Sequence, residues 1–217
     1  MKKNHLVGLV AAVNVVGLCL AGNVMAGESE RRVNYVEAKV GMFQPTGDMD
    51  DADYDTGGDL SVVYGRYLNN FLVLEAGFDL FGSEQNLSGY NDQAGSYEQD
   101  NYLTSAALFA TLKGEFSTGP VDLFAGIGAG IYSVSLSSDI DSSRLGDLDE
   151  DDSDGVFGAH VVAGATFNIT DRFFVGVEGK YRWTDEVEIS DSVASIPVEY
   201  SGDLSGYTVT FNGGFRF

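Results

Sequence analysis

Residues 207–217 read YTVTFNGGFRF, a stretch in which polar residues alternate with apolar or aromatic ones. Tyr207, Val209 and Phe211 belong to the apolar series, and a threonine separates each of the first two from the next member. Successive side chains of a β-strand point to opposite faces of the sheet. The stretch therefore predicts a strand with one apolar face and one polar face.

The same alternation recurs along the chain and predicts seven further strands. In residues 173–183, for example, Glu178, Lys180 and Arg182 share one face, opposite valines and aromatic residues. The alternation is less clean in the second and fourth segments, so it does not fix which of their faces is polar. The predicted strands are residues 33–43, 60–68, 71–81, 101–114, 121–134, 156–168, 173–183 and 206–217.

The connections between these strands alternate strictly between short and long. A soluble sandwich turns its apolar faces inward, whereas a membrane barrel turns them to lipid and encloses its polar side chains. Tight turns at one rim and long loops at the other are typical of outer-membrane barrels. Four long structureless loops are unusual in a compact soluble domain. We therefore predict an all-β, eight-stranded, antiparallel, up-and-down transmembrane β-barrel, whose long connections are residues 45–59, 82–100, 137–155 and 184–204.

Aromatic residues near the ends of the predicted strands agree with this interpretation. Such belts form where an amphipathic ring meets the boundary between water and lipid. The alternative is that aromatic residues simply favour strands. The candidates are Tyr67, Phe71, Phe116, Phe167, Phe173, Phe215 and Phe217 on the side of the short turns, and Phe81, Tyr102, Tyr132, Trp183 and Tyr207 towards the long loops.

The composition and the first residues indicate an exported acidic protein. The 217 residues carry 33 acids and 12 bases, a net charge of −21 that excludes nucleic-acid binding through a basic surface. Lys2 and Lys3 precede a short apolar run, and Val24 and Ala26 are small residues before Gly27. This pattern predicts a cleavable signal peptide over residues 1–26 and a barrel domain over residues 27–217. The apolar run is shorter than a membrane-spanning helix requires.

Three segments resemble the OmpA/OmpX-like superfamily of small outer-membrane β-barrels. They are the terminal strand already quoted, residues 40–48 (VGMFQPTGD), and the repeated glycines of residues 126–130. The resemblance extends over most of residues 33–217. It implies an outer-membrane location, contact with lipid and lipopolysaccharide, and recognition of the last strand by the barrel assembly machinery. The residues of that assembly signal are Tyr207, Val209, Phe211, Phe215 and Phe217.

The interior of an eight-stranded barrel is just wide enough for side chains to fill it. Five acids and five bases on the predicted inward faces neutralise one another if they are paired. They form either a salt-bridge plug or the lining of a narrow pore. Gly126, Gly128 and Gly130 are expected to make room for long Lys, Arg or Tyr side chains opposite. The ten predicted lumenal charges are Glu37, Lys39, Glu75, Asp79, Lys113, Glu115, Glu178, Lys180, Arg182 and Arg216.

The long connections hold 24 of the 33 acids and a single base, Arg144. Such a rim is expected to bind divalent cations diffusely. Glu150, Asp152 and Asp154 alternate before a glycine, but Val161 occupies the position at which a calcium loop needs its bidentate glutamate. We therefore treat these three acids as weak candidates, and we predict solvated loops without a specific metal or cofactor.

The leading functional prediction is a non-enzymatic envelope scaffold that presents acidic surface loops for interaction or adhesion. A small cation-preferring, porin-like channel is the alternative, because the predicted mouth is negative. A lipid hydrolase embedded in the barrel is a weaker alternative. It would depend on His160, the one histidine after the predicted signal peptide, together with a nucleophile and a carboxylate that the neighbouring sequence does not supply.

Overall fold

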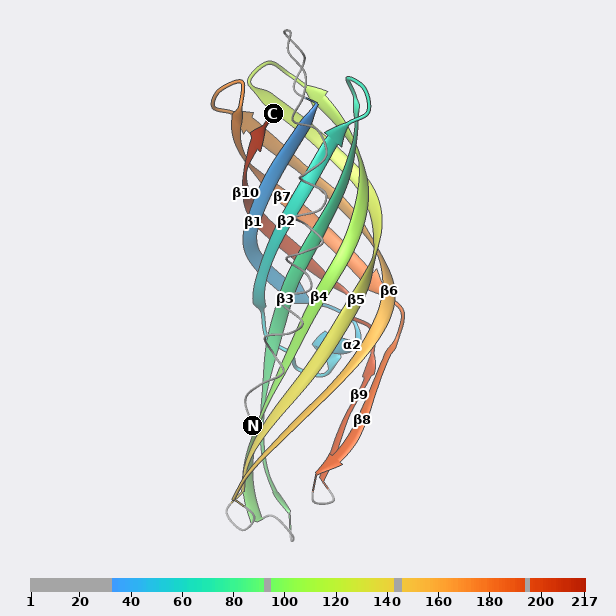
Figure 1. Cartoon of the computed structure of the whole chain (residues 1–217). Coiled ribbons are helices and arrows are strands. Elements are labelled where there is room, and N and C mark those ends of the chain that lie inside the picture. Colours follow the sequence, from blue (N-terminus) through green and yellow to red (C-terminus); the bar gives the residue numbers. More distant parts are fainter. Residues whose placement is uncertain (1–32, 92–94, 143–145, 194–195) are drawn as a thin grey trace.

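The computed structural model describes residues 33–91, 95–142, 146–193 and 196–217, so the predicted signal peptide lies outside it. These residues form a closed, all-antiparallel β-barrel (Figure 1). The prediction of an eight-stranded barrel is confirmed for this part of the chain. None of the helices found there is long and apolar enough to cross a membrane.

Each strand of the barrel pairs with its neighbours in sequence, and the last strand closes the sheet against the first. The short-turn end of the barrel carries the C-terminus and lies at the top of Figure 1. The opposite end, which we call the long-hairpin end, carries the longer connections. The barrel strands are β1 (Asn34–Pro45), β2 (Gly57–Tyr67), β3 (Leu72–Asn91), β4 (Gly95–Ser117), β5 (Val121–Ser142), β6 (Gly146–Asn168), β7 (Phe173–Thr184) and β10 (Gly206–Arg216).

The strand register keeps the polar face inside around the whole barrel. At the closing seam Lys39 pairs with Asn212, and the next residue, Val40, pairs with Phe211. Lys39 is 2% exposed, whereas Phe211 is 70% exposed. A slip of one residue would exchange these two faces, so burial of the charged side chains specifies the register. The apolar faces therefore point outward, as the sequence predicts.

The structure also decides the facing of β2 and β4, which the sequence leaves open. Asp59 and Ser61 of β2 and Thr111 and Lys113 of β4 are buried in the lumen. Their neighbours on the other face, including Leu60, are exposed on the outside of the barrel.

The expectation of four structureless loops is wrong. The strands β3 to β6 continue beyond the barrel as a four-stranded extension, which narrows to the bottom of Figure 1. Strand β3 leaves the barrel at Gly82, which pairs with Gly58 near the start of β2. It then continues to Asn91, a distance of about 30 Å at the usual rise per residue of a strand. Several inward positions of this extension are polar, such as Ser83, Gln85 and Gln99, so its buried face shows little apolar alternation in the sequence. Periodicity therefore gave no signal for this extension.

The remaining long connections also contain regular structure. The connection after β7 forms a separate two-stranded hairpin of β8 (Val187–Val193) and β9 (Ile196–Gly202). The connection after β1 holds one helical turn, α2 (Asp48–Asp51), whose Met49 is fully buried. Backbone bonds hold part of this connection against β3, because the Asp55 amide donates to the Glu84 carbonyl at 2.8 Å.

Candidate functional site

The middle of the lumen contains a buried network of charged side chains. Glu178 accepts hydrogen bonds from the ammonium groups of Lys39 at 2.6 Å and Lys113 at 2.8 Å. Lys113 also pairs with Glu75 at 2.9 Å. All four side chains are at most 5% exposed. The network joins strands on opposite sides of the barrel, because Glu178 lies on β7, Lys39 on β1 and Lys113 on β4.

A second group of charges lies nearer the long-hairpin end. The Arg182 guanidinium is fully buried and lies 2.7 Å from Asp59 and 3.4 Å from Asp79. Lys180 pairs with the same Asp79 at 2.9 Å. The guanidinium also stacks over the ring of Phe81, with 3.7 Å between its central carbon and the ring centroid. These contacts fill the lumen with paired charge rather than with an open path.

A third group closes the short-turn end. Arg216 pairs with Asp122 at 3.2 Å and lies over the Phe174 ring, 4.5 Å from its centroid. Glu115 accepts a hydrogen bond from the Tyr67 hydroxyl at 2.9 Å. Glu115 and Arg216 are half-buried, whereas the other eight of the ten predicted lumenal charges are buried.

The expected balance of five acids and five bases is wrong, because two buried acids were missed. Asp122 alternates with Gly126, Gly128 and Gly130 on one face of β5, and this pattern was the available signal. Asp59 lies one residue before the predicted start of its strand, in a position that the sequence pattern assigns to a loop. Among the described residues the lumen thus holds seven acids and five bases, Glu37, Asp59, Glu75, Asp79, Glu115, Asp122 and Glu178 against Lys39, Lys113, Lys180, Arg182 and Arg216.

The three glycines of β5 make room for side chains on the neighbouring strands. A Cβ atom at Gly126 would lie 2.9 Å from Lys113 Cγ, in agreement with the expectation of a long basic side chain. At Gly128 it would lie 2.3 Å from His160 Nε2, and at Gly130 it would lie 2.9 Å from Phe109 Cβ. The space is thus used by a lysine, a histidine and a phenylalanine, and not by arginine or tyrosine.

His160 is buried in the lumen, with its Nε2 atom 2.8 Å from the Thr111 hydroxyl. The edge of its ring packs against Phe109, with 5.4 Å between ring centroids. Among the described residues its Nδ1 atom has no hydrogen-bond partner. A catalytic histidine of the serine-hydrolase type is oriented by a carboxylate at that nitrogen. The described groups therefore do not form such a triad around His160.

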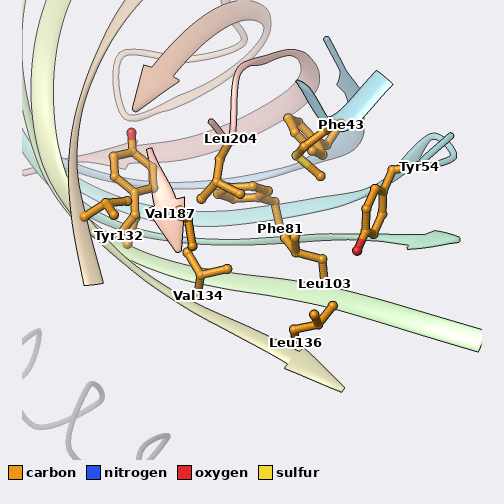
Figure 2. Packing of buried hydrophobic residues seen from close by; sticks show 12 residues of the cluster. Phe43, Tyr54, Phe81, Leu103, Tyr132, Val134, Leu136, Val187 and Leu204 are labelled. Carbon is orange, nitrogen blue, oxygen red and sulfur yellow. The ribbon is translucent and has the colours of Figure 1, made fainter. Parts of the chain in front are cut away.

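An apolar cluster, here called the apolar plug, fills the barrel at the long-hairpin end. Phe43 and Phe81 pack at 4.7 Å between ring centroids. Met49 from α2 and Val187 from β8 are fully buried in the same cluster. Figure 2 shows side chains from several strands gathered around Phe81. The plug consists of Phe43, Met49, Tyr54, Phe81, Leu103, Ala107, Tyr132, Val134, Leu136, Val156, Val187 and Leu204.

The prediction of aromatic belts at the lipid boundary is wrong for three of its residues. Phe81 and Tyr132 are each 1% exposed, so they lie inside the barrel and not at a lipid boundary. Tyr67 also points inward, because its hydroxyl binds Glu115. Phe81 alternates with Glu75 and Asp79 on one strand, a signal that could have placed it inside. The remaining belt candidates are exposed or half-buried.

The side chains of the weak metal candidates Glu150, Asp152 and Asp154 lie outside the described residues. Their backbone belongs to β6 and pairs continuously with β5, so it does not form a loop that wraps around an ion. Within the side chains that the structure does describe, no three His, Cys, Asp or Glu residues are grouped to hold a metal ion.

A comparison with known protein families agrees with the apolar exterior and the enclosed charges of the barrel. The chain matches the family described as outer membrane protein beta-barrel domain over residues 11–217. The chain belongs to this family. Membership in this outer-membrane barrel family implies an outer-membrane location, and no curated protein matches the chain.

Several solved outer-membrane proteins share the fold of this family member. OprG from Pseudomonas aeruginosa has a TM-score of 0.58 at 8% identity, over 87% of this chain and 97% of that one. A major outer membrane protein from Thermus thermophilus has a TM-score of 0.54 at 12% identity, over 85% and 99%. At such low identity the likeness shows the fold alone.

Proposed function

We propose that this protein is a non-enzymatic, non-conducting scaffold of the outer membrane that presents an acidic extension for interaction at the cell surface. The observation that carries the proposal is the filled lumen. Paired charges occupy its middle, and the apolar plug closes the long-hairpin end. A barrel closed in this way supports a surface structure rather than a path for solutes.

The plug argues against the alternative of a cation-preferring channel. An ion would have to pass the fully buried rings of Phe43 and Phe81 without water, and then displace the buried partners of Arg182. Both steps are costly for a charge. The acidic rim alone favours the channel. Planar-bilayer recording of the purified protein tests the proposal: we expect no discrete conductance steps, and reproducible steps in the wild type would refute it.

The proposal places the short-turn end in the periplasm and the strand extension outside the cell. Short periplasmic turns and longer outer connections are the rule in this class of barrel. Residues 27–217 contain no cysteine, so single cysteines can report the orientation. Asp185 at the long-hairpin end and Asp171 at the short-turn end are both exposed. In intact cells a membrane-impermeant maleimide should label Asp185→Cys but not Asp171→Cys, and the reverse result would overturn the orientation.

The acidic surface suggests the chemistry of its partners. Carboxylates attract basic polypeptide surfaces, and they approach lipopolysaccharide phosphates through bridging divalent cations. Binding of intact cells to a basic protein coated on a surface should therefore weaken with added salt. Binding that does not change with salt would contradict an electrostatic role for the extension.

The scaffold proposal includes no catalytic step. His160 and Thr111 lie inside a filled lumen, away from lipid and without a third group at Nδ1 among the described residues. We expect that His160→Ala leaves the lipid composition of the cells unchanged. A changed composition would favour the hydrolase instead.

Recognition by the barrel assembly machinery is part of the same proposal. Phe217 is 46% exposed and stacks on Phe215, with 6.3 Å between ring centroids. If the terminal ring is an assembly signal, Phe217→Ala should lower the amount of assembled barrel in cells while leaving refolding in detergent intact. Phe173→Ala, which removes an exposed ring at the same end, serves as the control.

A further inference from the structure

A small cavity remains in the lumen near the short-turn end. It encloses about 10 Å³, which is room for one body the size of a water molecule. We call it the lumenal cavity. Its polar wall is formed by Glu37, Tyr67, Lys113, Glu115, Thr166 and Arg216.

Two carboxylates of this wall lack a close basic partner among the described residues. The nearest ammonium group to Glu37 is that of Lys39, at 3.9 Å, and Lys39 is held more closely by Glu178, at 2.6 Å. Glu115 accepts the Tyr67 hydroxyl, and no ion pair within 4.0 Å joins it to a base of the described chain. The two-acid excess of the lumen therefore coincides with the two acids that face this cavity.

The two bases of the cavity wall are already engaged elsewhere. Lys113 lies 2.9 Å from Glu75 and 2.8 Å from Glu178. Arg216 pairs with Asp122 and donates to the Asn168 side chain. They therefore do not neutralise Glu37 and Glu115 directly.

Thr166 supplies an independent indication of a ligand. Thr166 is only 6% exposed and lines the cavity. Its hydroxyl oxygen has no hydrogen-bond partner among the described residues. A buried hydroxyl that stays unpaired costs free energy, so it is normally satisfied by a bound species.

We propose that the lumenal cavity binds a single monovalent metal cation through the carboxylates of Glu37 and Glu115 and the hydroxyl oxygen of Thr166. Hard oxygen donors suit alkali and alkaline-earth ions. The small size of the cavity favours an ion no larger than a water molecule, such as sodium. The cavity has no room for the waters that Mg²⁺ retains and offers fewer oxygen donors than Ca²⁺ takes, so we expect a monovalent rather than a divalent ion.

The test measures thermal unfolding of the refolded full-length barrel domain in detergent at constant ionic strength. Sodium chloride is compared with N-methyl-D-glucamine chloride, whose cation is too large for the cavity, and with caesium chloride. We expect a saturable rise in the unfolding temperature with sodium and a smaller rise with caesium. A crystal soaked in a thallium(I) salt should show an anomalous peak between Glu37, Glu115 and Thr166.

Two substitutions locate the effect within the protein. Glu115→Gln and Thr166→Val should each raise the sodium concentration at half-saturation by about tenfold, because the first removes the negative charge of a ligand and the second removes a ligand oxygen. Thr210→Val is the matched control, since Thr210 is also buried in the lumen but does not line the cavity. It should leave the sodium response unchanged.

Equal stability in sodium and N-methyl-D-glucamine, together with the lack of an anomalous peak in the cavity, would overturn the proposal. Stability that varies with pH but not with sodium would also overturn it, because protons would then neutralise the two carboxylates. These comparisons use the wild-type protein, so the proposal stays testable even if a variant fails to fold.

Discussion

Replacing Arg182 by methionine removes the most deeply buried cation of the described lumen while keeping much of its volume. The guanidinium is fully buried, lies 2.7 Å from Asp59 and stacks over Phe81. At an effective dielectric constant of about 20, opposite charges about 3 Å apart attract by about 5 kcal/mol. Losing one member of a buried pair typically costs about 3–5 kcal/mol, because the other charge remains buried without compensation. We therefore expect Arg182→Met to lower the free energy of unfolding by about 4 kcal/mol.

Urea-induced unfolding from detergent micelles measures this loss, with fluorescence of Trp183 as the signal. Trp183 is the one tryptophan of the chain and is 43% exposed on the outside of the barrel. The double variant Arg182→Met/Asp59→Asn removes both charges and leaves neither one buried without a partner. Its loss of unfolding free energy should therefore be about 2 kcal/mol smaller than the sum of the losses of the two single variants. Arg216→Met, in a pair that is partly exposed at the short-turn end, should cost only about 1 kcal/mol.

A loss of less than about 1 kcal/mol in the free energy of unfolding of Arg182→Met, which is the range of surface pairs, would refute a strong buried ion pair. A coupling free energy of zero in the double-variant cycle would refute the pairing with Asp59 specifically. In that case the stability of the lumen would come from packing alone.

Three further substitutions, one of them with a control variant, test other parts of the structure by the same unfolding assay. Gly128→Ala should lower the free energy of unfolding by about 1–3 kcal/mol, because the new Cβ would lie 2.3 Å from His160 Nε2. Gly179→Ala is the control: its Cβ would have no atom closer than 3.8 Å, so stability should change by less than about 0.5 kcal/mol. Equal effects of the two substitutions would contradict the close approach at Gly128. Phe81→Ala should cost about 3–5 kcal/mol by leaving a void in the apolar plug, and a neutral result would show that the plug is loosely packed. Burial raises the pKa of Tyr54 from about 10 to about 12, so this tyrosine ionises at lower pH in the unfolded chain than in the folded protein. The stability of the wild type should therefore fall as the pH rises above about 10, and Tyr54→Phe should lessen that fall. An identical pH profile for the two proteins would argue against burial of this ring.

The sequence by itself determined the architecture and the inward face of most strands. Facing in a strand depends only on whether a position is odd or even, so Glu37, Lys39 and Glu178 could be assigned to the lumen from their neighbours alone. The alternation of short and long connections then distinguished a membrane barrel from a soluble sandwich. Both signals are local, or depend only on the order of elements along the chain.

Only the tertiary structure decided which lumenal groups meet. Lys180 on β7 binds Asp79 on β3 across the closed barrel, and these residues are 101 positions apart in the sequence. Their contact depends on the stagger of all the strands between them, which alternation does not encode. The strand extension was likewise hidden, since polar residues such as Ser83, Gln85 and Gln99 occupy its buried face and leave no clear hydrophobic period. Phe81 is part of a plug because α2, β8 and the ends of the strands meet over the same opening, and these segments are far apart in the sequence.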